Sequence, residues 1–156
     1  MNEQTRNLIE NLMAEYVSFI DNDELEQWPE LFAEQCLYSV TNRENHAQGY
    51  AHGAIWANSR GMLKDRVSAL REANIYEEQV YRHIGDAVRL ITLDNDIATV
   101  QSNFMVVRTM HTGDIHLFAT GMYLDRIRIQ GDKALFEERI VVCDSQKIDT
   151  LLAIPL

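Results

Sequence analysis

Proton transfer is the chemistry for which this sequence supplies the most suitable side chains: one histidine, His83, and two aspartates, Asp21 and Asp23. A histidine beside a carboxylate can act as a general acid or base near neutral pH. If the fold closes a cavity around the pair, Tyr16 is a candidate to join it. A structural role explains the same residues, because Asp21 and Asp23 suit a turn and a helix cap and His83 suits a core position. The residues alone leave both interpretations open.

The histidines and cysteines show no pattern typical of a metal centre. A Rieske cluster needs two thiolates and two imidazoles at short spacings, and Cys36 and Cys143 have no histidine at those spacings. Nor do the histidines form an HxxxH or HxxxxD pair that would begin a mononuclear iron site; they are His46, His52, His83, His111 and His116. A P-loop, a GxGxxG turn and a GxSxG elbow are also absent. We expect neither a cofactor nor a metal in this chain.

Composition and charge narrow the class of protein. The 156 residues are 46% hydrophobic and 24% charged, as in an ordinary globular domain, and the formal net charge is −10. Such a charge repels phosphate backbones and anionic membranes, so nucleic acid and membrane partners are not expected. Two distant cysteines fit a reducing cytoplasm, and we find neither a signal peptide nor a membrane-spanning run. We predict a single cytoplasmic domain over residues 1–156.

The first half of the chain is predicted to be mainly helical. Apolar residues at helical spacing predict helices over 3–20, 24–32 and 55–71. Between the second and third helices we expect a strand over 36–40 and a loop over 41–54.

The second half is predicted to be a meander of four antiparallel strands, beginning at Val88 and joined by turns at 94–96, 112–114 and 131–132. On the third strand, alternation places Leu117 and Tyr123 on the same face. Helices followed by a long curved antiparallel sheet indicate an α+β fold in which the helices cover one face of the sheet and a cone with a cavity results.

The sequence ends with an apolar segment, LLAIPL, over residues 151–156. Apolar side chains left in water would promote aggregation or docking. Either the core of this chain or a neighbouring chain must therefore cover them.

Three stretches resemble one family along almost the whole chain: EQWPELFAEQCLYSVTNREN, MLKDRVSALREANIYEEQVYRHI and VVCDSQKIDTLLAIPL. They are similar to the small (β) subunits of Rieske non-haem iron aromatic-ring-hydroxylating dioxygenases. The resemblance implies a cystatin-like or NTF2-like cone with no redox centre of its own. It also implies a large α subunit that holds a Rieske [2Fe–2S] cluster and a mononuclear Fe(II), in an α3β3 heterohexamer with β–β contacts in a trimer.

The resemblance further implies the reaction of the complex. A reductase supplies electrons from NADH, and both atoms of O2 are added to an aromatic ring to give a cis-dihydrodiol. The implied substrate is an aromatic carboxylate, terephthalate by similarity. In this interpretation the chain is a non-catalytic structural subunit of the dioxygenase.

If the chain assembles in such a heterohexamer, some of its residues must lie in contacts between subunits. We expect neighbouring subunits to cover Leu151, Leu152, Ile154 and Leu156 of the tail. The proposed interface residues are Arg66, Arg82, His83, Asp144, Leu152 and Leu156, since arginines pair with carboxylates and leucines supply desolvated area. Two alternatives remain: a stand-alone dehydratase or isomerase using His83 with Asp21 or Asp23, and a carrier of small molecules using the same cavity.

Overall fold

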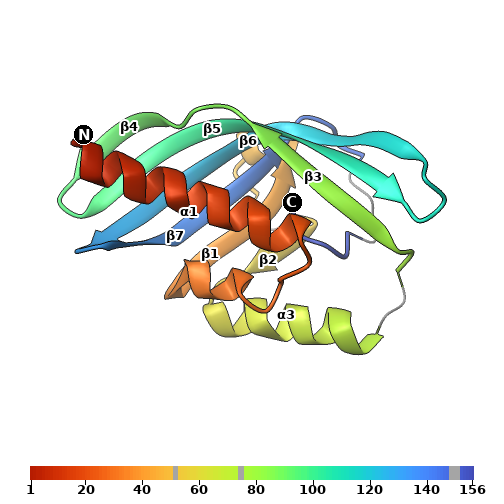
Figure 1. Ribbon diagram of the computed structural model, residues 1–156. Coiled ribbons are helices and arrows are strands. Elements are labelled where there is room, and N and C mark those ends of the chain that lie inside the picture. The colour runs from red at the N-terminus through yellow and green to blue at the C-terminus, as the bar shows by residue number, and fades with distance from the viewer. Residues whose placement is uncertain (51–52, 74–75, 148–151) are drawn as a thin grey trace.

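A computed structural model describes residues 1–50, 53–73, 76–147 and 152–156. The described residues form a strongly curved seven-stranded sheet, and a long helix lies along its concave face (Figure 1). The strands are β1 (Phe32–Asn42), β2 (Ile55–Ala57), β3 (Gln79–Gly85), β4 (Arg89–Asp94), β5 (Ile97–Met110), β6 (Ile115–Gln130) and β7 (Lys133–Cys143). Their order across the sheet is β2-β1-β7-β6-β5-β3, and β4 also pairs with β5.

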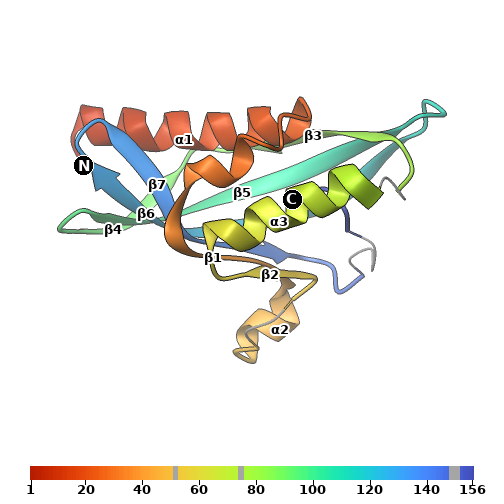
Figure 2. The same ribbon diagram turned by 90° about the horizontal axis from the view of Figure 1, so that it is seen from below.

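The helices are α1 (Glu3–Asp21), the 3-10 turn η1 (Trp28–Leu31), α2 (Arg43–Ala47) and α3 (Arg60–Ala73). The Asn2 side chain caps α1 by accepting a hydrogen bond from the backbone N–H of Thr5 at 2.8 Å. Helix α1 buries one stripe against the sheet, and α3 packs against β1, β2 and η1. In Figure 2, α2 projects from the end of β1 away from α1.

The α+β class predicted from the sequence is confirmed, with one difference in the sheet. The meander β4 to β7 is antiparallel throughout, as expected. Strand β1, however, pairs in parallel with β7, with Tyr38 opposite Arg139 and Val40 opposite Val141. The sheet is therefore mixed, and this parallel pair joins the first half of the chain to the last strand.

Several predicted boundaries were wrong because pairing within the sheet overrides local propensity. Residues 55–57 form a strand, with Val40 opposite Ile55, and the third helix begins only at Arg60. The second helix shrinks to a 3-10 turn in which Pro29 lies near the start, and β1 begins directly after it. The short helix α2 lies within the expected loop, and β3 was not predicted.

A bulge between β5 and β6 changes which residues face the interior. Val106 is opposite Ala119, but Val107 is opposite Leu117, so Phe118 is the additional residue. Phe118 packs inside against Tyr81, with the ring centroids 5.5 Å apart. Leu117 is consequently 65% exposed, and the prediction that it shares a face with Tyr123 was wrong.

Candidate functional site

The structure brings His83 and Asp21 together between β3 and the last residue of α1. The two side-chain atoms Nδ1 of His83 and Oδ1 of Asp21 are 2.6 Å apart, and Oδ2 accepts the backbone N–H of His83 at 2.8 Å. The side chains are only 1% and 3% exposed. Asp21 thus fixes both the backbone and the ring of His83, and the imidazole is held by a carboxylate rather than by a backbone group.

Asp23 does not belong to this pair. It has a positive φ of 57° in the turn after α1, and its carboxylate binds the Nη1 atom of Arg71 at 2.7 Å. Arg71 also binds Glu26 at 2.6 Å and so lowers the pKa of that carboxyl. Asp23 therefore links the turn to α3. The prediction that it caps the second helix was wrong, because Gln27 is at that position.

A pocket of about 460 Å³ opens beside the pair, between α1 and the strands that face it. Its lining includes His83, Asp21, Tyr123 and Arg139. The atoms Nε2 of His83 and Oη of Tyr123 are buried and have no hydrogen-bond partner among the described residues. The pocket is thus bordered by polar groups whose hydrogen bonding is incomplete.

Beneath the pocket lies a buried ion pair that was not predicted from the sequence. Arg139 on β7 donates from Nε and Nη2 to the two carboxylate oxygens of Asp125 on β6, both at 2.8 Å. The side chains are 1% and 0% exposed. The guanidinium also lies over the rings of Tyr16, Tyr123 and Phe136, with 3.8 to 4.3 Å to the centroids. Burial opposes its charge, but Asp125 and the phenols outweigh burial and raise the pKa of Arg139.

The alternation of the strands contained the signal for this pair. Asp125 lies two residues from the buried Tyr123 and Ile127, and Arg139 lies two residues from the buried Val141. Each charged residue therefore has the parity of the inner face. Two opposite charges at inward positions of neighbouring strands would have predicted the pair.

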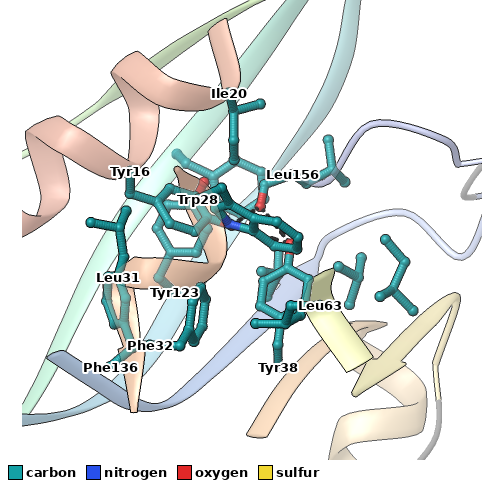
Figure 3. Close-up of a cluster of buried hydrophobic side chains, with 14 of the residues drawn as sticks. Tyr16, Ile20, Trp28, Leu31, Phe32, Tyr38, Leu63, Tyr123, Phe136 and Leu156 are labelled. Carbon is teal, nitrogen blue, oxygen red and sulfur yellow. Dashed lines mark hydrogen bonds between the residues drawn. The ribbon is translucent and has the colours of Figure 1, made fainter. Parts of the chain in front are cut away.

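The tail is covered by this chain itself. Leu152, Ile154 and Leu156 belong to its hydrophobic core, and Leu156 is 1% exposed. The hydroxyls of Tyr16 and Tyr38 lie 2.5 and 3.0 Å from the backbone oxygen of Leu156, to which they donate (Figure 3). Burial raises the pKa of both phenols, which keeps them neutral donors.

The expectation that neighbouring subunits cover Leu152, Ile154 and Leu156 was therefore wrong, because the aromatic core supplies both apolar contacts and donors to this segment. Leu151 lies outside the described residues. Arg66 also binds the tail, since its Nη2 donates to the backbone oxygen of Leu152 at 2.5 Å. Burial lowers the pKa of Arg66. Within the chain, Arg66 thus stabilises the tail.

The other proposed interface residues differ in exposure. Asp144 is partly exposed, and it binds Arg43 at 3.0 Å and the hydroxyl of Thr120 at 2.8 Å. Arg82 is exposed on β3 between the buried residues Tyr81 and His83. Of the proposed set, Arg82 and Asp144 are thus on the surface of the chain.

Arg82 lies within an apolar surface that we call the outer patch, on the convex face of β3, β5 and β6. The register aligns Arg82 with Val107 and Leu117, and the flanking rows contain the other exposed members. The exposed apolar residues of the outer patch are Val80, Ile84, Met105, Ile115 and Leu117. The sequence contained a signal for it, because these strands have apolar residues at both parities.

No three His, Cys, Asp or Glu side chains are grouped to hold a metal ion in the parts of the chain that the structure describes. None of the helices in these described residues combines the length and the apolar composition of a membrane-spanning segment.

Comparisons with known proteins all indicate the same family of proteins. The model of the ring hydroxylating beta subunit family matches residues 16–150. The chain is 50% identical over 143 residues to beta subunit 1 of the terminal oxygenase component of terephthalate 1,2-dioxygenase from Comamonas sp, covering 92% of this chain and 93% of that protein. It is 35% identical over 145 residues to the anthranilate 1,2-dioxygenase small subunit from Burkholderia cepacia, covering 93% and 90%.

Solved structures show the same relationship. A beta subunit provisionally assigned to an aromatic-ring-hydroxylating dioxygenase of Novosphingobium aromaticivorans superposes with a TM-score of 0.90 at 33% identity, covering 97% of each chain. The beta subunit of benzoate 1,2-dioxygenase from Burkholderia mallei gives 0.73 at 17% identity, covering 87% and 88%, which shows the fold alone. With a family match over most of its length and relatives of 35% and 50% identity, this chain belongs to the ring hydroxylating beta subunit family.

Proposed function

We propose that this chain is the non-catalytic structural subunit of a dioxygenase that converts an aromatic carboxylate, terephthalate, to a cis-dihydrodiol. The single observation that supports this most is the 50% identity over 92% of the chain with the beta subunit of terephthalate 1,2-dioxygenase. The anthranilate enzyme's small subunit, at 35% identity, also comes from an enzyme named for an aromatic carboxylate. These identities favour the subunit over a stand-alone dehydratase or isomerase.

In this proposal the large subunit holds the Rieske [2Fe–2S] cluster and the mononuclear Fe(II), and a reductase delivers electrons from NADH. The donor groups of this chain support that division. A Rieske cluster needs two thiolates and two imidazoles, and the described residues contain no group of even three suitable side chains. Cys36 and Cys143 are both free thiols, which suits a cytoplasmic complex.

The outer patch is the surface that we assign to the contact with another subunit. Ile115 and Leu117 are 68% and 65% exposed, and they adjoin the exposed Val80, Ile84 and Met105. An exposed apolar cluster of this kind supports a protein contact, and Arg82 within it supplies a donor for a partner carboxylate. The expected assembly is α3β3.

The first test is the native mass of the chain, expressed alone and together with the large subunit encoded beside it. We expect a heterohexamer whose iron all belongs to the large subunit. A monomer or dimer that ignores the large subunit would contradict the proposal.

A second test addresses the outer patch. Leu117→Lys should prevent co-purification with the partner, because a charge replaces one of the most exposed apolar side chains of the outer patch. Leu93→Lys is the matched control, since Leu93 is 44% exposed on β4 and lies outside the outer patch. Equal yields of complex from both variants would exclude the outer patch as the contact.

A further inference from the structure

The pocket beside α1 contains two buried polar atoms whose hydrogen bonds the described residues do not complete. They are Nε2 of His83 and Oη of Tyr123. Buried polar atoms normally have partners, since leaving them unpaired costs stability. The backbone oxygen of Leu156 satisfies the hydroxyls of Tyr16 and Tyr38 in the same core. Tyr123 therefore differs from Tyr16 and Tyr38, because it borders the pocket and its hydroxyl does not donate to the tail.

The hydrogen-bonding roles of the two atoms follow from their neighbours. Asp21 can only accept through its carboxylate oxygens, so the proton of a neutral His83 ring lies on Nδ1 and Nε2 is left as an acceptor. Burial raises the pKa of Tyr123 well above its usual value, so this hydroxyl remains neutral and can both donate and accept. A ligand hydroxyl matches this arrangement, because it donates one hydrogen bond and accepts another.

Part of the remaining lining is apolar and would contact the body of the ligand, beside the polar residues Ser18, Asn22, Ser102 and Asn103. Met13, Val17 and Val88 border the pocket with apolar surface. The ring of Tyr123 is itself fixed by stacking on Phe104, with the centroids 4.6 Å apart. The volume of about 460 Å³ admits a single aromatic ring with substituents.

The charges of the lining disfavour an anion. Asp21 and Asp86 contribute carboxylates to the pocket. Arg139 is already paired with Asp125 through two hydrogen bonds. Arg82 also belongs to the lining, but its side chain alternates with the inward Tyr81 and His83 and so lies toward the exposed edge of the pocket. A carboxylate beside Nε2 of His83 would therefore face the carboxylate of Asp21 and an arginine that is already paired with Asp125.

The geometry points to a binding site in this pocket for a small uncharged ring compound with a hydroxyl group, of the phenol class. The hydroxyl donates to Nε2 of His83 and accepts from Oη of Tyr123, and the ring packs against Met13 and Val17.

Ligand-observed ¹⁹F NMR provides the test, since it works on the full chain alone and in its complex. The three probes are 4-fluorophenol, 4-fluorotoluene and 4-fluorobenzoate, which differ only in the group opposite fluorine. We expect 4-fluorophenol to bind at least about fivefold more tightly than 4-fluorotoluene, the worth of one net hydrogen bond. We expect 4-fluorobenzoate to bind more weakly than 4-fluorophenol.

Variants locate the binding. Tyr123→Phe keeps the ring and removes the hydroxyl, and should reduce the affinity for 4-fluorophenol about fivefold while leaving that for 4-fluorotoluene unchanged. Tyr50→Phe is the control, because Tyr50 is 60% exposed and outside the pocket lining. His83→Gln is a second variant, once thermal unfolding shows that it folds. It should also reduce the affinity for 4-fluorophenol, because it removes the Nε2 acceptor.

Three results would overturn the inference. One is equal binding of 4-fluorophenol and 4-fluorotoluene, and another is tighter binding of 4-fluorobenzoate. The third is the absence of 4-fluorophenol binding at millimolar concentration, which would mean that the two polar atoms are satisfied by water alone.

Discussion

The two faces of β3, β5 and β6 are both rich in apolar residues, but only one of them is covered within the chain. On the inner face, Tyr81, Val106 and Tyr123 are buried under α1 and the tail. On the outer face, the neighbouring positions Val80, Met105 and Leu117 form the exposed outer patch. A strand that is apolar at both parities is typical of a sheet covered on both sides. The chain supplies one cover, and we propose that a partner subunit supplies the other.

Ion pairs between β6 and β7 also differ in burial between the two faces of the sheet. On the inner face, Arg139 and Asp125 are fully enclosed and their hydrogen bonds are directed at each other. Arg128 and Glu137 also pair between β6 and β7, but this pair is partly exposed. Loss of an ion pair between these two strands should therefore reduce the free energy of unfolding more on the inner face than on the outer face. Substitution of one arginine at a time can measure this difference.

The largest effect is expected at Arg139. Arg139→Leu leaves the Asp125 carboxylate buried without its partner, which should reduce the free energy of unfolding by about 3–5 kcal/mol. The shift of the urea midpoint of the chain measures this. The double variant Arg139→Met, Asp125→Leu should recover most of the loss, because no unpaired charge remains.

Arg128→Leu is the matched control for that experiment. It breaks the partly exposed pair with Glu137 on the same strands, so the expected loss is about 0–1 kcal/mol. If Arg128→Leu destabilised the chain as much as Arg139→Leu, the difference between the two faces would not hold.

A smaller loss is expected from the tail. Leu156→Ala should cost about 2–3 kcal/mol in the isolated chain, toward the low end for a buried leucine, because the tail lies outside the sheet and can partly relax. Tyr38→Phe, which removes only one donor to Leu156, should cost about 0.5–1.5 kcal/mol. Unfolding in urea measures both. An unchanged midpoint for Leu156→Ala would mean that the tail needs a neighbouring subunit after all.

The features that the sequence predicted well depend on local periodicity. The apolar stripe over 3–20 located α1, and alternation located the four-stranded meander. The strands over 79–85 and 55–57 were missed because each depends on pairing with another strand, β5 and β1 respectively, and the second has only three residues. Leu117 was placed on the wrong face because a bulge cannot be seen in an alternating pattern.

The candidate site was predicted only in part for the same reason. His83 and Asp21 were selected by chemistry, but Asp23 was an equal candidate until the turn after α1 directed it toward Arg71. The partners of the tail, Tyr16 and Tyr38, lie more than 100 positions from Leu156 in the sequence. Contacts of that range depend on how β1 pairs with β7, which local patterns do not encode.

The smallest perturbation is chemical labelling of thiols. It compares the buried native cysteines of the inner face with a cysteine introduced on the outer face. Burial raises the pKa of Cys36 to about 11 and that of Cys143 to about 12. At pH 8 the folded chain should therefore react with a disulfide reagent at least ~100-fold more slowly than the chain unfolded in urea, since only the thiolate reacts. A cysteine introduced on the outer face by Leu117→Cys should react at the ordinary rate in the folded chain. Rapid labelling of Cys36 or Cys143 without unfolding would mean that the inner face opens to solvent, and the contrast between the covered and uncovered faces would then be one of degree.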